Sequence, residues 1–349
     1  MQSGKVVVLS SKSISEVDSA RQPLRWLVMA AGKSHYFSLN SYAVDLKTEL
    51  GTRFNQSVEV EISAATMDSI ASFRKLHRTI PRYDAVHLFY DGTASFFKSI
   101  LPVVLVARFY GKSTALFYYP NQMVDRIPRL HSKTMPLFER VFVGSKYQQR
   151  ELAKQNVSSE VLLPPIDINS WPARKISGVL PHLILSDENL SDAGAQCAIK
   201  AYSLVKQKYP RTTISIITSS REYWSTVAEQ IGLTLDDENF VNSQSADEIT
   251  RAFGNADIYV NCSLVESTPT PLLAALVSGM PVISFETYGA REIIHNCENG
   301  ILIEHNDYNQ LADRIIDLSE QPELVTKIST EAAKFRQVLL PEKFVQRFL

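Results

Sequence analysis

The chain has 349 residues and a mass of 39.2 kDa, which exceeds one ordinary compact core and suits two domains of about 150 to 200 residues each. Apolar residues make up 45% and charged residues 21%, with 13 Gly and 16 Pro, so a disordered or fibrous protein is excluded. The net charge is −1, but residues 1–165 hold 21 Lys and Arg against 13 Asp and Glu, a net charge of +8, whereas residues 166–349 hold 15 against 24, a net charge of −9. This asymmetry predicts two domains with different partners.

No segment has the character of a membrane anchor or a secretion signal. The longest apolar run, residues 100–107, is far shorter than the roughly 20 residues of a membrane-spanning helix. The apolar run at residues 6–9 is too short for the roughly 7–15 residues of a signal-peptide core. Cys197, Cys262 and Cys297 are far apart in the sequence, which is typical of reduced thiols. We therefore expect a soluble, cytoplasmic protein.

Short apolar, β-branched runs alternate with amphipathic stretches of ten or more residues, which predicts βαβ units around parallel sheets. Ser145, three residues before Gln148, predicts a capping box at a helix start. We expect strands at residues 26–30, 58–62, 85–89, 114–118, 140–143, 161–163, 183–185, 214–218, 257–261, 281–285 and 300–303.

A proline-containing segment predicts the boundary between the two halves. We expect an N-terminal domain over residues 1–165, a linker over 166–175, a C-terminal domain over 176–330 and a C-terminal helix over 331–349 that returns toward the N-terminal domain. Both domains are expected to be doubly wound, Rossmann-like α/β units. Ligands in such folds bind outside the carboxyl ends of the strands, here in a cleft between the facing domains.

The segment after the strand at 257–261 is the most informative one. Thr270 is a plausible N-cap, Pro271 suits the first helical position, and Gly279 ends the helix. The N-terminus of a helix there offers backbone amides and a positive dipole end to a diphosphate. An ordinary strand–loop–helix connection has the same pattern. Glu266 in the preceding loop favours the ligand-binding interpretation, because its carboxylate can accept hydrogen bonds from sugar hydroxyls.

With this segment the chain resembles the group 1 (family 4) glycosyltransferases of the GT-B fold, which transfer sugars from nucleotide-sugars with retention. The resemblance is continuous over about residues 181–330. It rests on Glu266, Pro271, Leu272, Leu273, Gly279, Pro281 and Val282, on the run from Gly289 to Ile294, and on Glu298, Asn299 and Gly300. It implies that the C-terminal domain binds the nucleotide-sugar and that the N-terminal domain binds the acceptor.

The chain departs from the family pattern at the donor site. Ala274 stands where the family has a second Glu that binds the nucleotide ribose. Glu188 and Ala193 stand where the family has an Arg and a Lys that face the leaving diphosphate, and Tyr118 and Tyr119 lie where many members have a His. The departures at Glu188 and Ala193 remove positive charge that would stabilise the leaving diphosphate, and the departure at Ala274 removes a contact with the ribose.

Other residues could compensate for the missing groups. Lys33 follows Gly32 after the first strand, Arg291 replaces a Pro of the family loop, and Arg221 follows the loop at Ser219, although a Lys or Arg beside a loop is more often a solvated charge. His35 could orient an acceptor hydroxyl or be a surface imidazole. The predicted site has Glu266 and His35 as catalytic residues and Tyr118 and Tyr119 on the acceptor side. Its donor-binding residues are Gly32, Lys33, Ser186, Glu188, Ser219, Ser267, Thr268, Thr270, Pro271 and Arg291.

Several other sites are not supported by the motifs. Gly32-Lys33-Ser34 lacks the upstream glycine of a phosphate-binding loop, because Leu27 occupies that position. The chain has no Gly-x-Ser-x-Gly elbow, no Asp-x-Asp pair and no histidines at metal-ligand spacing. We expect no metal and no cofactor, the nucleotide-sugar being a substrate.

Lys and Arg interleave with aromatic residues in segments 73–82 and 96–112. This pattern suits an anionic membrane surface or a lipid-linked acceptor, and a solvated helix face is the alternative. Nucleic acid is not expected as a partner, because an RNA-binding signature is missing and the other half is acidic.

Two hypotheses of different kinds follow. The first is a glycosyltransferase that adds a hexosyl group from a nucleotide-sugar to a glycan or lipid-linked acceptor in cell-surface polysaccharide synthesis, retaining, metal-independent and peripheral on the inner face of the membrane. The second is a non-catalytic GT-B subunit that binds the acceptor or supports a partner glycosyltransferase. A related epimerase or phosphorylase is a third alternative.

Overall fold

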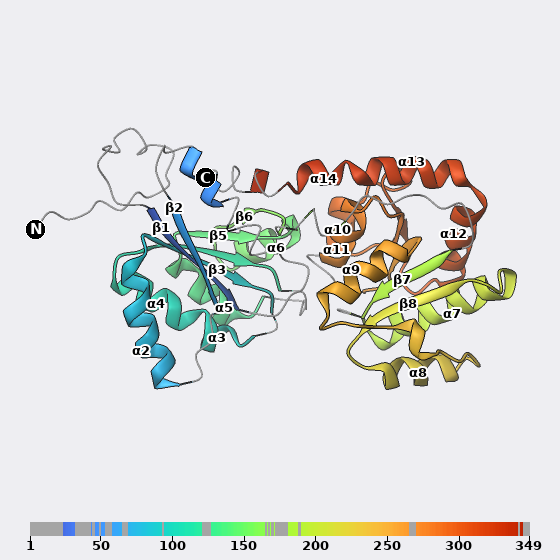
Figure 1. Cartoon of the computed structure of the whole chain (residues 1–349), viewed down its shortest axis with the longest axis horizontal. Helices are drawn as coiled ribbons and strands as arrows, with labels where there is room; N and C mark the ends of the chain where they lie inside the picture. The colour runs from blue at the N-terminus through green and yellow to red at the C-terminus, as the bar shows by residue number, and fades with distance from the viewer. Residues whose placement is uncertain are drawn as a thin grey trace, which may run out of the picture. The chain divides into compact units, whose positions relative to one another are not determined.

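The computed structural model describes residues 24–31, 43, 46–48, 50–52, 58–64, 69–92, 94–120, 127–164, 166, 168, 171, 181–187, 190–264, 270–340 and 343–344 (Figure 1). These residues form two compact units. The first unit takes the described residues up to 164 together with Leu340, Lys343 and Phe344. The second unit takes those of Ile166–Leu339.

The first unit contains a six-stranded parallel sheet in the order β2-β1-β3-β4-β5-β6. Its strands are β1 (Leu24–Ala31), β2 (Val58–Ala64), β3 (Ala85–Tyr90), β4 (Ser113–Tyr118), β5 (Arg140–Val143) and β6 (Glu160–Val161). Its helices include α2 (Ile70–Thr79), α3 (Phe96–Ser99), α4 (Leu101–Phe109), α5 (Arg129–Thr134) and α6 (Lys146–Ala153). Separate apolar clusters on Leu27, Leu88 and Leu116, and on Val28, Phe89 and Phe117, cover the two faces of the sheet, as a buried parallel sheet requires.

The second unit contains another six-stranded parallel sheet, in the order β12-β11-β10-β7-β8-β9. Its strands are β7 (His182–Ser186), β8 (Thr213–Thr218), β9 (Phe240–Asn242), β10 (Ile258–Asn261), β11 (Val282–Phe285) and β12 (Ile301–Ile303). Its helices are α7 (Asp192–Lys208), α8 (Arg221–Glu229), α9 (Ala246–Asn255), α10 (Thr270–Val277), α11 (Tyr288–Ile293), α12 (Tyr308–Glu320), α13 (Pro322–Ala333) and α14 (Phe335–Val338).

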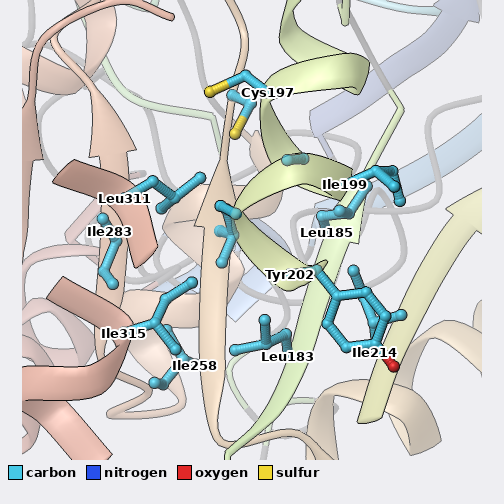
Figure 2. Close-up of a cluster of buried hydrophobic side chains, with 14 of the residues drawn as sticks. Leu183, Leu185, Cys197, Ile199, Tyr202, Ile214, Ile258, Ile283, Leu311 and Ile315 are labelled. Atoms are coloured by element: carbon cyan, nitrogen blue, oxygen red, sulfur yellow. The ribbon is translucent and has the colours of Figure 1, made fainter. Parts of the chain in front are cut away.

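The core of the second unit lies between this sheet and its helices. Figure 2 shows side chains of β7, α7 and α12 meeting there, among them Leu183, Tyr202 and Leu311. The exposed fraction of each of these three side chains is 3% or less. Apolar residues at helical spacing on α7 thus produce a helix packed against the strands.

All eleven predicted strands are present, within one or two residues, and both sheets are parallel as predicted. The prediction missed β9, a strand of three residues that is too short for an alternating pattern. The Ser145 hydroxyl accepts a hydrogen bond from the Gln148 N–H at 3.2 Å and caps α6, whereas the Gln148 side chain accepts from the Gly144 N–H at 2.8 Å. The predicted capping box therefore forms with its second bond displaced by one residue.

Three residues of the predicted linker, Ile166, Ile168 and Trp171, are buried in the second unit. The Arg336 guanidinium donates hydrogen bonds to the carbonyl oxygens of Ile168 at 2.9 Å and of Trp171 at 2.6 Å. These bonds attach the segment to α14. The predicted C-terminal helix over 331–349 falls partly on residues outside the described ranges. The cleft between the domains stays a prediction.

Among the described residues, no helix combines the length and the apolar character that a membrane span would require.

Candidate functional site

The strand order places a switch point between β7 and β10 of the second sheet. From β7 the chain builds β8 and β9 on one side and then crosses to build β10, β11 and β12 on the other. Connections leave neighbouring strands in opposite directions there, so a crevice opens at the carboxyl ends of the two strands. The corresponding point of the first sheet lies between β1 and β3.

Helix α7 begins directly beside the end of β10. The Ser191 hydroxyl caps α7 by accepting a hydrogen bond from the Gly194 N–H at 3.2 Å. A Cβ at position 194 would overlap the carbonyl oxygen of Cys262 and lie 2.8 Å from Leu190 Cδ1. Because only glycine allows this approach, the amides of the first turn of α7 lie at the switch point.

Helix α10 begins at Thr270, with Pro271 as its second residue, so the predicted start is displaced by one residue. All eight residues of α10 are buried. The helix ends at Val277. Gly279 follows it with φ at +70°, and the N–H groups of Gly279 and Met280 donate to the carbonyls of Leu276 and Ala275, both at 2.9 Å. This Schellman arrangement confirms the predicted helix end.

Three predicted donor-site residues precede this helix. Glu266, Ser267 and Thr268 lie in the connection from β10 to α10, outside the described residues. Gly32, Lys33, His35 and Glu188 also lie outside them. The roles assigned to these seven residues stay predictions.

A buried carboxyl group lies at the end of β7. Asp187 follows the buried Ser186 and accepts a hydrogen bond from the Thr218 hydroxyl at the end of β8. Burial raises the pKa of Asp187, and the hydrogen bonds from Thr218 and from the Ser219 backbone N–H oppose that shift. The Ser219 backbone thus bonds to a carboxyl group that sequence reasoning did not select, and Ser186 directly precedes that residue. The sequence signal that could have identified Asp187 is its position as a charged residue close after a predicted strand.

The ends of β10 and β11 carry a buried polar pair that was also missed. The Asn261 amide donates to the Ser284 hydroxyl at 3.1 Å, and its oxygen accepts from the Ser263 N–H at 3.3 Å. Each of these three residues is less than 5% exposed. These bonds hold Ser263, at the start of the connection that follows β10, to the end of the sheet.

Two of the three cations proposed to compensate for the missing groups are paired with carboxylates. Arg291 of α11 lies 2.7 Å from Glu286, and Arg221 of α8 lies 3.2 Å from Asp237. All four side chains are at least 40% exposed, so these ion pairs contribute little to stability. They do reduce the positive charge that each Arg could offer to a diphosphate.

Two family departures are visible in the described part of the chain. Ala274 is completely buried in α10, and Ala193 is exposed in the first turn of α7. Neither methyl group can bind a ribose hydroxyl or a phosphate.

The predicted acceptor-side residues lie at the end of β4 in the first unit. Tyr118 is 2% exposed and stacks on Tyr90, with ring centroids 5.4 Å apart, while Tyr119 is fully buried near Phe89 on the opposite face. Burial raises the pKa of the Tyr118 hydroxyl well above its ordinary value. Their contact with an acceptor stays a prediction.

His131 of α5, which sequence reasoning did not select, completes this cluster. Its Nδ1 lies 3.0 Å from Tyr118 Oη, and its ring stacks on Phe96 at 4.1 Å. Burial lowers the pKa of His131 to about 4, so the imidazole is neutral near pH 7.

Asp91 lies at the switch point of the first sheet, between the ends of β1 and β3. It is 4% exposed, directly follows β3, and donates its N–H to the Ala31 carbonyl at the end of β1 at 3.4 Å. Within the described ranges, no group of three or more His, Cys, Asp or Glu side chains is arranged to hold a metal ion.

Comparison with known proteins identifies the fold of this chain and the sequence family that its second unit resembles. A crystal structure of HepE from Anabaena in complex with UDP and glucose superposes on this chain with a TM-score of 0.69 and 14% identity, covering 93% of this chain and 98% of the other. The predicted fold is confirmed: this is a GT-B protein with two Rossmann-like units. Residues 181–335 match the sequence model "Glycosyl transferases group 1", in agreement with the resemblance found over about residues 181–330.

Curated relatives agree with this assignment. An uncharacterized glycosyltransferase of Haemophilus influenzae is 24% identical over 180 residues, which are 51% of this chain and 50% of the relative. A poly(glycerol-phosphate) alpha-glucosyltransferase of Bacillus subtilis is 25% identical over 187 residues, which are 53% of this chain and 27% of the relative. The chain therefore spans half or less of the length of these relatives.

Proposed function

We propose that the protein is a glycosyltransferase that moves a hexosyl group from a nucleotide-sugar to a glycan or lipid-linked acceptor in cell-surface polysaccharide synthesis. One observation carries the proposal: α7 starts at the switch point of the second sheet, where Gly194 packs against Cys262, within a domain that matches the group 1 glycosyltransferases. The relatives support the ligand classes. One is named for glucosyl transfer to poly(glycerol-phosphate), and HepE was crystallised with UDP and glucose.

In this proposal the connection from β10 to α10 holds the donor. Glu266 contacts the sugar or its phosphate, and the amides of Ser267, Thr268 and the start of α10 hold the diphosphate. Gly32 and Lys33 contact the donor from the first unit, and His35 orients the acceptor hydroxyl.

The bond from the anomeric carbon to the diphosphate breaks, and the diphosphate leaves with the electron pair. The acceptor oxygen bonds to that carbon and loses its proton. Fixed N–H donors aimed at the departing oxygens stabilise the charge that develops there. Retention of configuration and independence of metal belong to the same proposal, because the family resemblance implies them.

A second candidate function is a non-catalytic GT-B subunit that binds an acceptor or supports a partner glycosyltransferase. The specific observation in its favour is that Arg221 and Arg291 are paired with carboxylates, while Ala274 is buried where the family has a ribose-binding Glu. A donor site in which Arg221 and Arg291 are paired with carboxylates would bind a nucleoside diphosphate more weakly than one in which both are free.

Calorimetric titration of the purified protein with UDP, GDP, dTDP, ADP and CMP at moderate salt tests the two candidates. The enzyme should bind one of these nucleotides with micromolar affinity, because a diphosphate and a base fill the proposed donor site. Absence of binding to all five would favour the non-catalytic subunit.

The nucleotide that binds then defines the donor for an acceptor screen. Glu266→Ala should abolish transfer. The control variant Glu229→Ala removes an exposed carboxylate at the C-terminal end of α8 and should leave transfer unchanged. Full activity of Glu266→Ala would remove Glu266 from the site.

A further inference from the structure

Helices α2 and α4 of the first unit pack side by side (Figure 1) and expose large apolar side chains. The exposed fractions are 75% for Phe109, 50% for Leu105, 42% for Phe73 and 37% for Tyr110. Single exposed apolar residues are ordinary on protein surfaces, but a contiguous group of them marks an interaction site.

The three aromatic side chains form one group through His77, and Leu105 lies one helical turn before Phe109 on α4. The His77 ring lies 4.7 Å from Phe73, 6.1 Å from Phe109 and 5.7 Å from Tyr110, between ring centroids. His77 Nδ1 lies 3.2 Å from Tyr110 Oη, and Phe109 packs edge-on to Tyr110 at 5.0 Å. The aromatic residues of both helices are therefore held together in the folded protein.

Positive charge surrounds this group. Segments 69–82 and 94–112 contain seven Lys and Arg and no Asp or Glu. Arg74, Lys75, Arg78 and Arg108 are exposed, and the first three form no ion pair with any described residue. We call Phe73, Arg74, Lys75, Arg78, Leu105, Arg108, Phe109 and Tyr110 the α2–α4 surface.

We propose that the α2–α4 surface docks the protein on an anionic phospholipid bilayer. Phe109 and Leu105 enter the interfacial layer, Tyr110 and Phe73 lie at the level of the head groups, and the cations contact lipid phosphates. This inference does not depend on the proposed transfer reaction.

The combination of charges and apolar side chains favours a bilayer over other occupants. A soluble polyanion would contact the cations but leave Phe109 and Leu105 in water. A second copy of the chain, docked through the same surface, would bring four cations against four cations. An anionic bilayer pairs with both kinds of side chain.

Flotation of the full chain with unilamellar vesicles tests the proposal. Vesicles with 30% phosphatidylglycerol in phosphatidylcholine, roughly the range in which a basic segment responds to anionic lipid, should bind the protein at low salt and release it as salt rises. Pure phosphatidylcholine vesicles should bind it weakly. Equal binding to both vesicle types would overturn the proposal.

Two variants separate charge from apolar contact. The triple variant Arg74→Gln, Lys75→Gln, Arg78→Gln should bind anionic vesicles about 100-fold more weakly, since each cation contributes about fivefold. The control variant Arg211→Gln, Arg251→Gln, Lys327→Gln removes the same charge from exposed positions of the second unit and should bind like the wild type. Equal losses in both variants would mean that only net charge matters and would refute the docking surface.

The variant Leu105→Ala, Phe109→Ala keeps the charge and should weaken binding at least about tenfold. Val338→Ala, 38% exposed on α14, is its control. Unchanged vesicle binding of the double variant, together with tight binding to soluble polyphosphate, would assign the surface to a polyanion. A dimer in the wild type that becomes a monomer in this variant would assign it to a second copy.

A fluorescent reporter checks insertion directly. The three native tryptophans, Trp26, Trp171 and Trp224, are each at most 6% exposed, so Phe109→Trp adds an indole at an exposed position. Its emission should shift to shorter wavelength with anionic vesicles and be quenched by lipids brominated on the acyl chains. Val338→Trp should show neither effect. A Trp at position 109 that stays solvent-exposed on bound vesicles would exclude insertion.

Discussion

His87 lies in the middle of β3, where its imidazole is enclosed by aromatic rings. Its ring is edge-on to Trp26 at 4.5 Å and tilted toward Phe117 at 5.5 Å, and it is 3% exposed. Burial, followed by the charge of Arg140, lowers the pKa of His87 to about 3. The folded protein therefore keeps this imidazole neutral over a pH range in which an unfolded chain would protonate it.

A loss of stability in acid follows from this lowered pKa. The unfolded chain takes up a proton below its ordinary histidine pKa of about 6.5, whereas the folded chain does so only near pH 3. The contribution of His87 to the free energy of unfolding is thus complete above about pH 6.5 and is lost as the pH falls toward 3. The loss amounts to about 2–3 kcal/mol at pH 4.5. His87→Phe should reduce this pH dependence of unfolding by about that amount.

Urea unfolding at pH 7.5 and pH 4.5, followed by hydrogen exchange of peptides that cover β1 and β3, measures the effect. Phe89→Leu is the control, because Phe89 stacks on Phe117 at 4.4 Å in the same cluster. It should lower stability equally at both pH values. An unchanged pH dependence in His87→Phe would show that other groups carry it.

The packing of α7 against β10 depends on one glycine. A side chain at position 194 would overlap the Cys262 carbonyl oxygen, which belongs to the backbone and has little freedom to move. Gly254, near the end of α9, has open space around its Cα. The two helical glycines therefore differ in tertiary contact.

Substitution of each by alanine should give opposite results. Gly194→Ala should lower the free energy of unfolding by about 1–3 kcal/mol, because helix and strand must separate. Gly254→Ala should raise it by about 0.5–1 kcal/mol, because alanine restricts the unfolded chain and favours helix. Scanning calorimetry of both variants measures the difference. A Gly194→Ala variant as stable as Gly254→Ala would mean that the contact is loose.

At the scale of the whole molecule, the C-terminal residues contribute to the unit that the N-terminal half builds. Phe344 is 5% exposed and lies in the cluster of Trp26, Val28 and Phe117, with its ring 5.6 Å from Phe117. Leu339, five residues earlier, is 4% exposed and belongs to the second unit. The chain thus passes from one unit to the other within these residues.

Truncation of these two side chains should act on different units. Phe344→Ala should destabilise the first unit by about 3–5 kcal/mol, and Leu339→Ala the second by about 2–5 kcal/mol. Hydrogen exchange in peptides that cover β4 and β10 reports the two effects separately. If either substitution loosened both sheets equally, the two units would unfold as one cooperative body.

Sequence alone determined the alternation of strands and helices, because apolar periodicity and the positions of Gly and Pro act over a few neighbouring residues. The parallel strands, the end of α10 before Gly279 and the cap at Ser145 follow from such local patterns. The three residues of β9 were too few to show one.

Tertiary structure alone decided how charge and polarity are arranged at the carboxyl edges of the sheets. The bond from Asn261 to Ser284 and the contact of Tyr118 with His131 join different elements. The entry of Phe344 into the first unit joins residues more than 200 positions apart. Contacts between distant residues depend on how whole elements pack, and a short motif carries no record of that packing.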